Sequence, residues 1–216
     1  MKVVIIGGRG NGTVIASTIE DCKKNGQDIE CVGFLNDFEN EINGYPVLGG
    51  IVNMDWKKLP EDYFFIFAMS NVKQAHKRYK MLKNLEIPDE RFATVIHPSS
   101  VVSRKAKIGF GVVLMPMVLV SPNVEIGNHS QMYAQSFIGH DSKMEEMVFV
   151  ANNASIGGRV LIKNGAHIGS NSTLLERLEI GEFGIVGLAS VVLKTVNSYD
   201  IVVGSPARVI GNILNK

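Results

Sequence analysis

This sequence of 216 residues has few cysteines and tryptophans and almost no net charge. It has two cysteines, Cys22 and Cys31, one tryptophan, and 22 basic against 21 acidic residues, so its formal net charge is +1. Two cysteines nine residues apart are too few for a disulfide framework and wrongly spaced for a zinc knuckle, so we expect inert thiols. A near-neutral chain without basic runs does not favour nucleic acid or an anionic membrane as a partner. We therefore expect a small specific ligand.

Long hydrophobic runs are also missing. The start, MKVVIIGGRG, is a short apolar run that ends at glycines, unlike a signal peptide. No segment approaches the roughly 20 apolar residues that a transmembrane helix needs. We therefore expect a cytoplasmic protein. With 216 residues, 45% of them hydrophobic, the chain can form one large domain or two small ones, each with a buried core.

The first half of the sequence alternates strand-like and helix-like segments. KVVIIG, CVGFLND and FFIFAM resemble strands, whereas residues 13–25 and NVKQAHKRYKMLKNL resemble helices. This order predicts an α/β domain with a small parallel, Rossmann-like sheet over residues 1–93.

The second half is a repeat. From Ile96 onward every sixth residue is branched aliphatic or methionine, without a failure, in the series Ile96, Val102, Ile108, Leu114, Val120, Ile126, Met132, Ile138, Met144, Val150, Ile156, Ile162, Ile168, Leu174, Ile180, Val186 and Val192. A period of six is typical of parallel β-helices, whose units stack around a continuous core. Three hexads per coil would place residues 18 apart in sequence about 4.8 Å apart in space. We predict a β-helix of about six coils over residues 94–216.

A glycine-rich loop, GGRGNG, lies between the first strand and the first helix. Its glycines could bring backbone N–H groups and the helix N-terminus against a phosphate. The spacing is not the strict dinucleotide fingerprint. Asp37, near the end of the second strand, keeps NAD binding open as an alternative.

The hexads, the ending VVGSPARVI and the nucleotide-type first half together resemble the hexapeptide-repeat acyltransferases. More narrowly, the chain is similar to the subgroup that N-acetylates nucleotide-linked amino sugars or O-acetylates sialic acid, including the bacillosamine and perosamine N-acetyltransferases. The resemblance covers nearly the whole chain. It implies a left-handed β-helix, acetyl-CoA as acyl donor, no metal and a homotrimer.

The segment FIGHDSKM carries the chemistry that this resemblance implies. The 18-residue register stacks Gly158 on His140, and Arg159 on Asp141. By resemblance, His140 is the general base, Asp141 orients it, and the Gly158 amide binds the thioester carbonyl; proton removal and oxyanion binding are what acyl transfer requires. The alternative is a surface histidine beside a solvated carboxylate, with Gly158 as a corner glycine. Arg159 could also occupy the carboxylate of Asp141.

Other histidines are expected to serve as surface or capping residues, namely His76, His97, His129 and His167. A zinc site would need three converging imidazoles, and the register puts His129 and His140 on different faces. One departure from the resembled family is visible, because relatives often carry a second histidine, near the sugar, where this chain has Phe149. It leaves the identity of the acceptor sugar open.

The resemblance also assigns binding residues. Coenzyme A would follow a track of small residues, with Gly158, Gly169, Ser170, Gly187 and Leu188 as its contacts. The first domain would hold the nucleotide. Its glycine-rich loop would contact the pyrophosphate, and other residues would lie near the base and the ribose. The residues assigned in this way are Gly7, Gly8, Gly10, Asn11, Gly12, Asn36, Asp37, Ser70 and Asn71.

Three functions remain open at this point. The resemblance favours an acetyl-CoA-dependent N-acetyltransferase for a nucleotide-linked 4-amino-4,6-dideoxy sugar of a surface glycan such as lipopolysaccharide, by direct attack of the amine. O-acetylation of sialic acid or another sugar is the second. A solenoid that only binds a nucleotide sugar is the third, and it predicts no thiol release.

Overall fold

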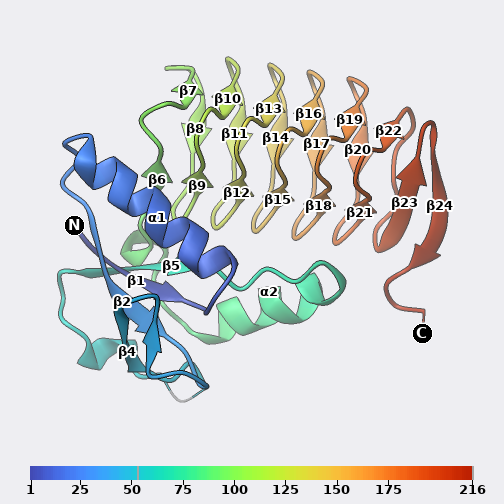
Figure 1. Cartoon of the computed structure of the whole chain (residues 1–216). Coiled ribbons are helices and arrows are strands. Elements are labelled where there is room, and N and C mark those ends of the chain that lie inside the picture. Colours follow the sequence, from blue (N-terminus) through green and yellow to red (C-terminus); the bar gives the residue numbers. More distant parts are fainter. Residues whose placement is uncertain (53, 216) are drawn as a thin grey trace.

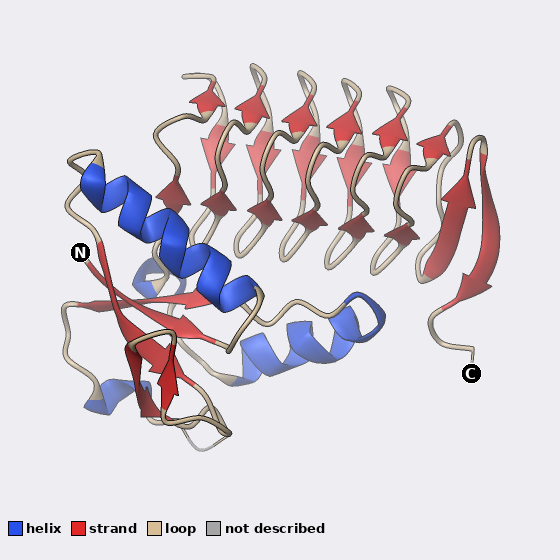
Figure 2. Cartoon of the chain, in the orientation of Figure 1, coloured by secondary structure: helices blue, strands red, loops and turns tan. Residues whose placement is uncertain are grey.

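A computed structural model describes residues 1–52 and 54–215. It consists of an α/β part followed by a long stack of parallel strands, a left-handed β-helix, as Figures 1 and 2 show. The fold class predicted from the sequence is therefore confirmed. None of the helices in the described residues is long and apolar enough to cross a membrane.

The N-terminal sheet has the strand order β3-β4-β2-β1-β5. The three expected strands are β1 (Lys2–Ile6), β2 (Glu30–Leu35) and β5 (Tyr63–Phe67), and the two expected helices are α1 (Asn11–Lys24) and α2 (Ala75–Asn84). The sequence analysis missed β3 (Glu41–Ile42) and β4 (Tyr45–Gly49). They form a hairpin around Asn43 and Gly44, whose φ values of 48° and 82° suit a tight Asn-Gly turn.

The β-helix repeats strands of two residues. Its strands are β6 (Val95–Ile96), β7 (Val101–Val102), β8 (Lys107–Ile108), β9 (Val113–Leu114), β10 (Leu119–Val120), β11 (Glu125–Ile126), β12 (Gln131–Met132), β13 (Phe137–Ile138), β14 (Lys143–Met144), β15 (Phe149–Val150), β16 (Ser155–Ile156), β17 (Leu161–Ile162), β18 (His167–Ile168), β19 (Thr173–Leu174), β20 (Glu179–Ile180), β21 (Ile185–Val186) and β22 (Val191–Val192).

The pairing register is 18 residues, as predicted. Phe137 pairs with Ser155 and Ile138 with Ile156, and the same step recurs along each of the three walls. The second residue of each strand points inward, so the hexad aliphatics form one continuous core. From Gly111 to Ala189, a residue with positive φ turns each corner between strands, and Asp141 with φ of 59° is one of these.

The outward residues of the three walls differ in chemistry. We call one wall the uncharged face; its outward strand residues are Val101, Leu119, Phe137, Ser155, Thr173 and Val191. The charged face carries Lys107, Glu125, Lys143, Leu161 and Glu179. The third, the covered face, includes β12, β15 and β18 and lies toward the N-terminal part, to which the Gln131 side chain donates a hydrogen bond at the Phe67 carbonyl, 2.9 Å away.

A hairpin closes the C-terminal end of the stack. β23 (Asp200–Gly204) pairs in parallel with β21 and continues the covered face, and β24 (Ala207–Asn212) turns back antiparallel to it. The hexad series ends at Val192, and the sequence analysis did not anticipate this hairpin.

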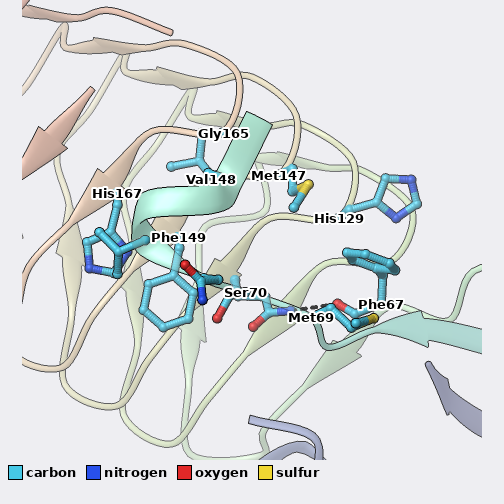
Figure 3. Close-up of a pocket in the computed structure, with 13 residues that line it drawn as sticks. Phe67, Met69, Ser70, His129, Met147, Val148, Phe149, Gly165 and His167 are labelled. Atoms are coloured by element: carbon cyan, nitrogen blue, oxygen red, sulfur yellow. Dashed lines mark hydrogen bonds between the residues drawn. The ribbon is translucent and has the colours of Figure 1, made fainter. Parts of the chain in front are cut away.

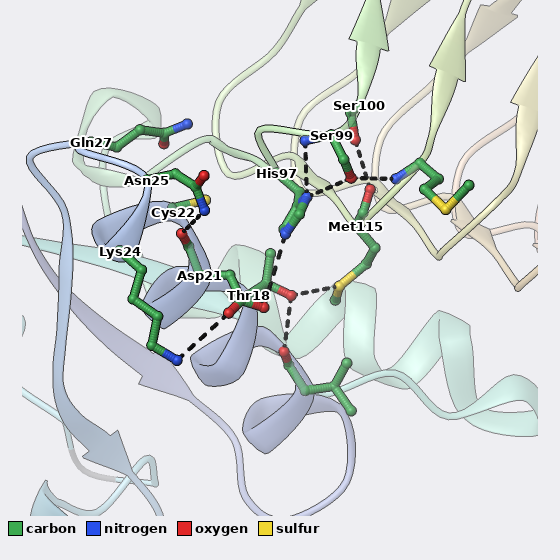
Figure 4. Close-up of polar contacts among 12 residues, drawn as sticks. Thr18, Asp21, Cys22, Lys24, Asn25, Gln27, His97, Ser99, Ser100 and Met115 are labelled. Carbon is green, nitrogen blue, oxygen red and sulfur yellow. Dashed lines mark hydrogen bonds and ion pairs between the residues drawn. The ribbon is translucent and has the colours of Figure 1, made fainter.

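Helix α1 packs on the first coils, as Figure 4 shows. The Thr18 hydroxyl lies 3.0 Å from the Met115 sulfur, and the Cys22 thiol lies 3.6 Å from the Ile96 carbonyl oxygen. Burial raises the pKa of the Cys22 thiol, and burial raises that of Cys31 to about 11. Both thiols therefore stay protonated at neutral pH, and a thiolate is the reactive form.

Candidate active site

His140 and Asp141 occupy the turn between β13 and β14. The His140 Nδ1 lies 2.7 Å from Asp141 Oδ2. This contact fixes the imidazole with Nδ1 as donor, because an ionised carboxylate only accepts. Nε2 is then left as the basic nitrogen. Half of the His140 side chain is exposed, so a substrate can reach it.

Asp141 is itself held by the neighbouring coils. The Asn123 amide donates to Asp141 Oδ1 at 2.9 Å, and Arg159 Nη2 lies 3.7 Å from Oδ2. The hydrogen bond from His140, followed by that from Asn123, keeps the pKa of the Asp141 carboxyl below its usual range. The carboxylate therefore remains ionised, and Arg159 approaches it without replacing the contact with His140.

Gly158 lies against the His140 ring. A methyl group added at Gly158 would be 2.9 Å from His140 Nε2. Within the described residues the Gly158 N–H makes no hydrogen bond to the protein. A small ligand group could thus meet the basic nitrogen and a backbone donor together, which is the arrangement that an acyl-transfer site needs.

The glycine-rich loop lies at the carboxyl ends of β1, β2 and β5. Gly10, with φ of 81°, precedes α1, which begins at Asn11. Gly12 packs so closely that an added methyl group would be 3.0 Å from the Phe34 ring. Gly7 and Gly8 would likewise meet Ala68 and Asn36. The loop therefore aims the N-terminus of α1 at this edge of the sheet, where an anion is stabilised.

Asn36 and Asp37 contribute to the shape of the same edge. The Asn36 amide donates to the Gly7 carbonyl at 3.1 Å, and its oxygen accepts from the backbone N–H groups of Phe38 and Glu39. Asp37 Oδ1 accepts from the backbone N–H of Ile51 at 2.7 Å. Both side chains hold loops in place, whatever else they contact.

Asn11, Ser70 and Asn71 come together beside the covered face. The Asn11 amide donates to the Ser70 hydroxyl, and the Tyr133 hydroxyl donates to Asn11 Oδ1 at 2.9 Å. Asn11, Ser70 and Asn71 also line one pocket with Phe149 and His167. The structure thus unites these predicted residues from two segments and adds side chains from the β-helix.

The predicted coenzyme A contacts lie along a different corner of the solenoid. Gly169 and Gly187 follow β18 and β21, and neither has room for a methyl group, which would meet the Leu188 nitrogen at 2.6 Å and Val203 at 2.4 Å. Ser170 is partly exposed, and Leu188 is 75% exposed. The wall formed by β16 and β19 separates this corner from Gly158, so one chain does not gather all five predicted contacts in one place.

The glycine-rich edge and His140 are also apart within the chain. β13 and β14, which flank the histidine turn, lie on the side of the solenoid away from α2 and the N-terminal sheet in Figure 1. The covered face, which contacts the N-terminal part, is opposite that corner. One chain therefore holds these two groups of predicted site residues apart, and we call them the two half-sites.

Comparisons with known proteins agree with this architecture. Residues 2–82 match the PglD N-terminal domain family. No curated protein sequence matches the chain. It is similar to the acetyltransferase domain of PglB from Neisseria gonorrhoeae, with 24% identity, a TM-score of 0.82, and 97% of this chain and 99% of that one covered.

Two further solved structures are similar over nearly the whole chain. One is a histidine-to-alanine variant of GDP-perosamine N-acetyltransferase from Caulobacter crescentus in complex with CoA and GDP-perosamine, with 23% identity, a TM-score of 0.82 and 98% of each chain covered. The other is WeeI from Acinetobacter baumannii, with 25% identity, a TM-score of 0.80, and 97% and 100% covered. The chain has the fold of the hexapeptide-repeat sugar acetyltransferases.

The resemblance inferred from the sequence is thus confirmed, but the expectation for two histidines is wrong. His129 is buried, with its ring 4.4 Å from that of Phe92. His167 stacks on Phe149, with ring centres 5.0 Å apart. Burial lowers the pKa of each to about 4. His129 lies in the turn before β12 and packs on Phe92, and His167 is a partly buried strand residue of the covered face, so neither is a plain surface or capping residue.

Sequence reasoning also missed the contacts of Asn123 and Tyr133 and the contribution of the covered face to the pocket beside Asn11. The 18-residue register alone places Asn123 beside Asp141, so that contact was within reach. The contact of Tyr133 with Asn11 depends on how the two parts pack, and no periodicity reports it. The described residues contain no group of three or more His, Cys, Asp or Glu side chains that could hold a metal ion.

Proposed function

We propose that this chain is a cytoplasmic, acetyl-CoA-dependent N-acetyltransferase that acts on a nucleotide-linked 4-amino-4,6-dideoxy sugar in surface-glycan synthesis. The observation that carries the proposal is the His140–Asp141 pair, 2.7 Å apart, with Nε2 open beside Gly158. The similarity to the PglD N-terminal domain and to perosamine N-acetyltransferase supports the choice of substrate. We also take residues 1–93 as the nucleotide-sugar domain and 94–216 as the acyltransferase domain.

The proposed reaction is a direct transfer without a covalent enzyme intermediate. The sugar amine attacks the thioester carbonyl, and His140 Nε2 takes a proton from the attacking nitrogen. Asp141 stabilises the imidazolium that results. The Gly158 N–H donates to the developing oxyanion. The C–S bond then breaks and the sulfur takes the proton from the His140 imidazolium, so that coenzyme A leaves as its thiol, the sugar carries an amide and His140 is neutral again.

The two half-sites suggest how the catalytic centre is completed. We propose a homotrimer in which His140 of one copy meets the glycine-rich edge of the next. The uncharged face supports this, because its outward strand residues lack charge and Val101 and Leu119 are exposed, whereas the charged face is covered by ion pairs such as Lys107–Glu125 at 2.7 Å. Exposed apolar surface of this kind marks protein interfaces.

The test is thiol release from acetyl-CoA with a panel of UDP-, dTDP- and GDP-linked 4-amino-4,6-dideoxy sugars and free sialic acid. We expect release with an amino sugar, and we expect His140→Ala to lower the rate by about 10² or more, the usual contribution of a general base. Binding of the nucleotide sugar, measured by calorimetry, should be nearly unchanged in that variant.

The matched control is His97→Asn. His97 accepts the Ser99 N–H at 3.1 Å, a bond that an asparagine can replace, and it lies on the first coil. Its rate should equal that of the wild type. Equal rates for His140→Ala and wild type would exclude His140 as the base. Release with sialic acid alone would indicate O-acetylation, and binding without any release would indicate a nucleotide-sugar-binding protein.

A further inference from the structure

A pocket lies between the covered face and the loop that follows β5. Figure 3 shows His167 and Phe149 side by side on one side of it, with Ser70 nearby. The inner cavity is narrow, about 30 Å³, and is continuous with a wider, more open pocket of about 610 Å³ that reaches Asn11, because the two share Ser70, Asn71, Phe149 and His167. It therefore opens beside the start of α1, where the proposed function places the nucleotide sugar.

His167 is held there as a neutral hydrogen-bonding group. Its ring is parallel to that of Phe149, with an interplanar angle of 3°, so packing fixes its orientation. Burial lowers its pKa to about 4, so it is uncharged at neutral pH. Within the described residues neither ring nitrogen makes a hydrogen bond. A neutral imidazole offers one donor and one acceptor, and here both remain available.

The surroundings select a particular kind of ligand group. Phe149 is fixed between Tyr133, with ring centres 4.7 Å apart, and His167, and it presents an apolar wall. A phosphate would favour a protonated imidazole, whereas a hydroxyl pairs well with a neutral one. An apolar wall next to a neutral donor and acceptor fits a sugar ring that carries a methyl group and hydroxyls.

We propose that His167 binds a hydroxyl of the acceptor sugar, while Phe149 packs against the apolar side of that sugar. This inference rests on the proposed function and adds a specificity-determining residue to it. His167 lies one coil beyond Phe149, the position at which the resemblance leads one to expect a second histidine.

The experiment compares steady-state kinetics of wild type, His167→Phe, the swap Phe149→His with His167→Phe, and the control His97→Asn. His167→Phe keeps the aromatic stack and removes the hydrogen bond. We expect the KM for the nucleotide sugar to rise about 5-fold, since a hydrogen bond is worth roughly 1 kcal/mol and 1.4 kcal/mol is tenfold. The kcat should change less than about threefold and the KM for acetyl-CoA should not change.

The swap variant separates binding from packing. It returns an imidazole to the same pocket one coil earlier, about 5 Å away, so it should recover most of the lost affinity. A role in packing alone predicts no such recovery. Unchanged KM in His167→Phe, or a rise in the KM for acetyl-CoA instead, would overturn the inference.

Folding and the proposed function are controlled separately. Circular dichroism shows whether His167→Phe folds like the wild type. If it does not, we compare the chemical shifts of the His167 ring nitrogens in ¹⁵N-labelled wild type with and without the nucleotide sugar. Identical shifts overturn the inference. If the wild type releases no thiol, the proposed function fails. Calorimetry with the same panel of nucleotide sugars then tests the His167 inference separately. Weaker binding by His167→Phe than by wild type supports the inference, and equal binding, or no binding by wild type, overturns it.

Discussion

At the level of single residues, the proposed base depends on a short chain of contacts across three coils. Asn123, Asp141 and Arg159 stack at 18-residue steps, and the carboxylate between them accepts from His140. The direct hydrogen bonds from His140 and Asn123 are short, and the guanidinium is farther away. Asn123 and His140 therefore set the position of the carboxylate, and Arg159 adds little.

Asp141→Asn tests this order of importance. The asparagine can still accept a hydrogen bond from His140, but it no longer stabilises the imidazolium, so we expect kcat to fall by roughly 10² with little change in KM. Arg159→Gln is the control. Its contact is 3.7 Å long between half-exposed groups, and such pairs contribute about 0–1 kcal/mol. A larger loss in Arg159→Gln than in Asp141→Asn would contradict our account.

Gly158→Ala tests the space above the imidazole. The new methyl group would lie 2.9 Å from His140 Nε2, where the substrate amine must approach. We expect activity to fall at least tenfold while the melting temperature changes by no more than about 4 °C, because the side chain that must move is exposed and flexible. Gly49→Ala is the control, since its methyl group would meet only Leu35 at 3.7 Å, and it should keep full activity.

At the level of elements, the β-helix was predictable because its core repeats. The hexad series gave the 18-residue register, the inward residues and the neighbours of Asp141. The hairpin of β23 and β24 lies beyond the last hexad. β3 has only two residues, and β4, YPVLG, contains a proline and a glycine, which are poor strand signals. The packing of the covered face against the loop after β5 joins residues far apart in sequence, such as Tyr133 and Asn11. No local pattern encodes that contact, so the pocket could not be predicted.

His129, in the turn between β11 and β12, should make the packing of the β-helix against the N-terminal part sensitive to acid. Burial lowers the pKa of His129 to about 4, while Asp89, at 3.6 Å from Nε2, acts in the opposite direction. An unfolded histidine titrates near 6.5. The unfolded chain thus binds more protons between these values, and the stabilisation is complete above about pH 6.5 and is lost as the pH falls toward 4.

Melting temperatures between pH 7.5 and 4.5 measure this loss. A separation of 2.5 pKa units corresponds to on the order of 3 kcal/mol, so the wild type should melt markedly lower at pH 4.5. His129→Asn, which suits the φ of 60° at this corner, should be less stable at neutral pH but should lose less on acidification. An equal slope in both proteins would show that other groups, such as Glu146, cause the loss.

At the level of the whole molecule, the separation of the half-sites leads to one more prediction. If copies pack through the uncharged face, a charge placed on it should break the assembly and the activity together. Leu119→Glu introduces a carboxylate at a residue that is 42% exposed, so the fold of one chain should persist. Light scattering after size-exclusion chromatography should show a trimer for wild type and a monomer for Leu119→Glu, with thiol release reduced by about 10² or more because the general base is lost from the site.

A substitution on the charged face serves as the control. Leu161→Glu places the same charge on a wall that already carries Lys143 and Glu179, in register with both. It should leave the trimer and the activity intact. Mixing Leu119→Glu with an excess of His140→Ala should not restore activity. The added carboxylate keeps the Leu119→Glu chain, which carries the intact His140, out of a mixed trimer. A monomeric wild type with full activity would contradict the shared site, because one chain holds His140 and the glycine-rich edge on opposite sides of the solenoid.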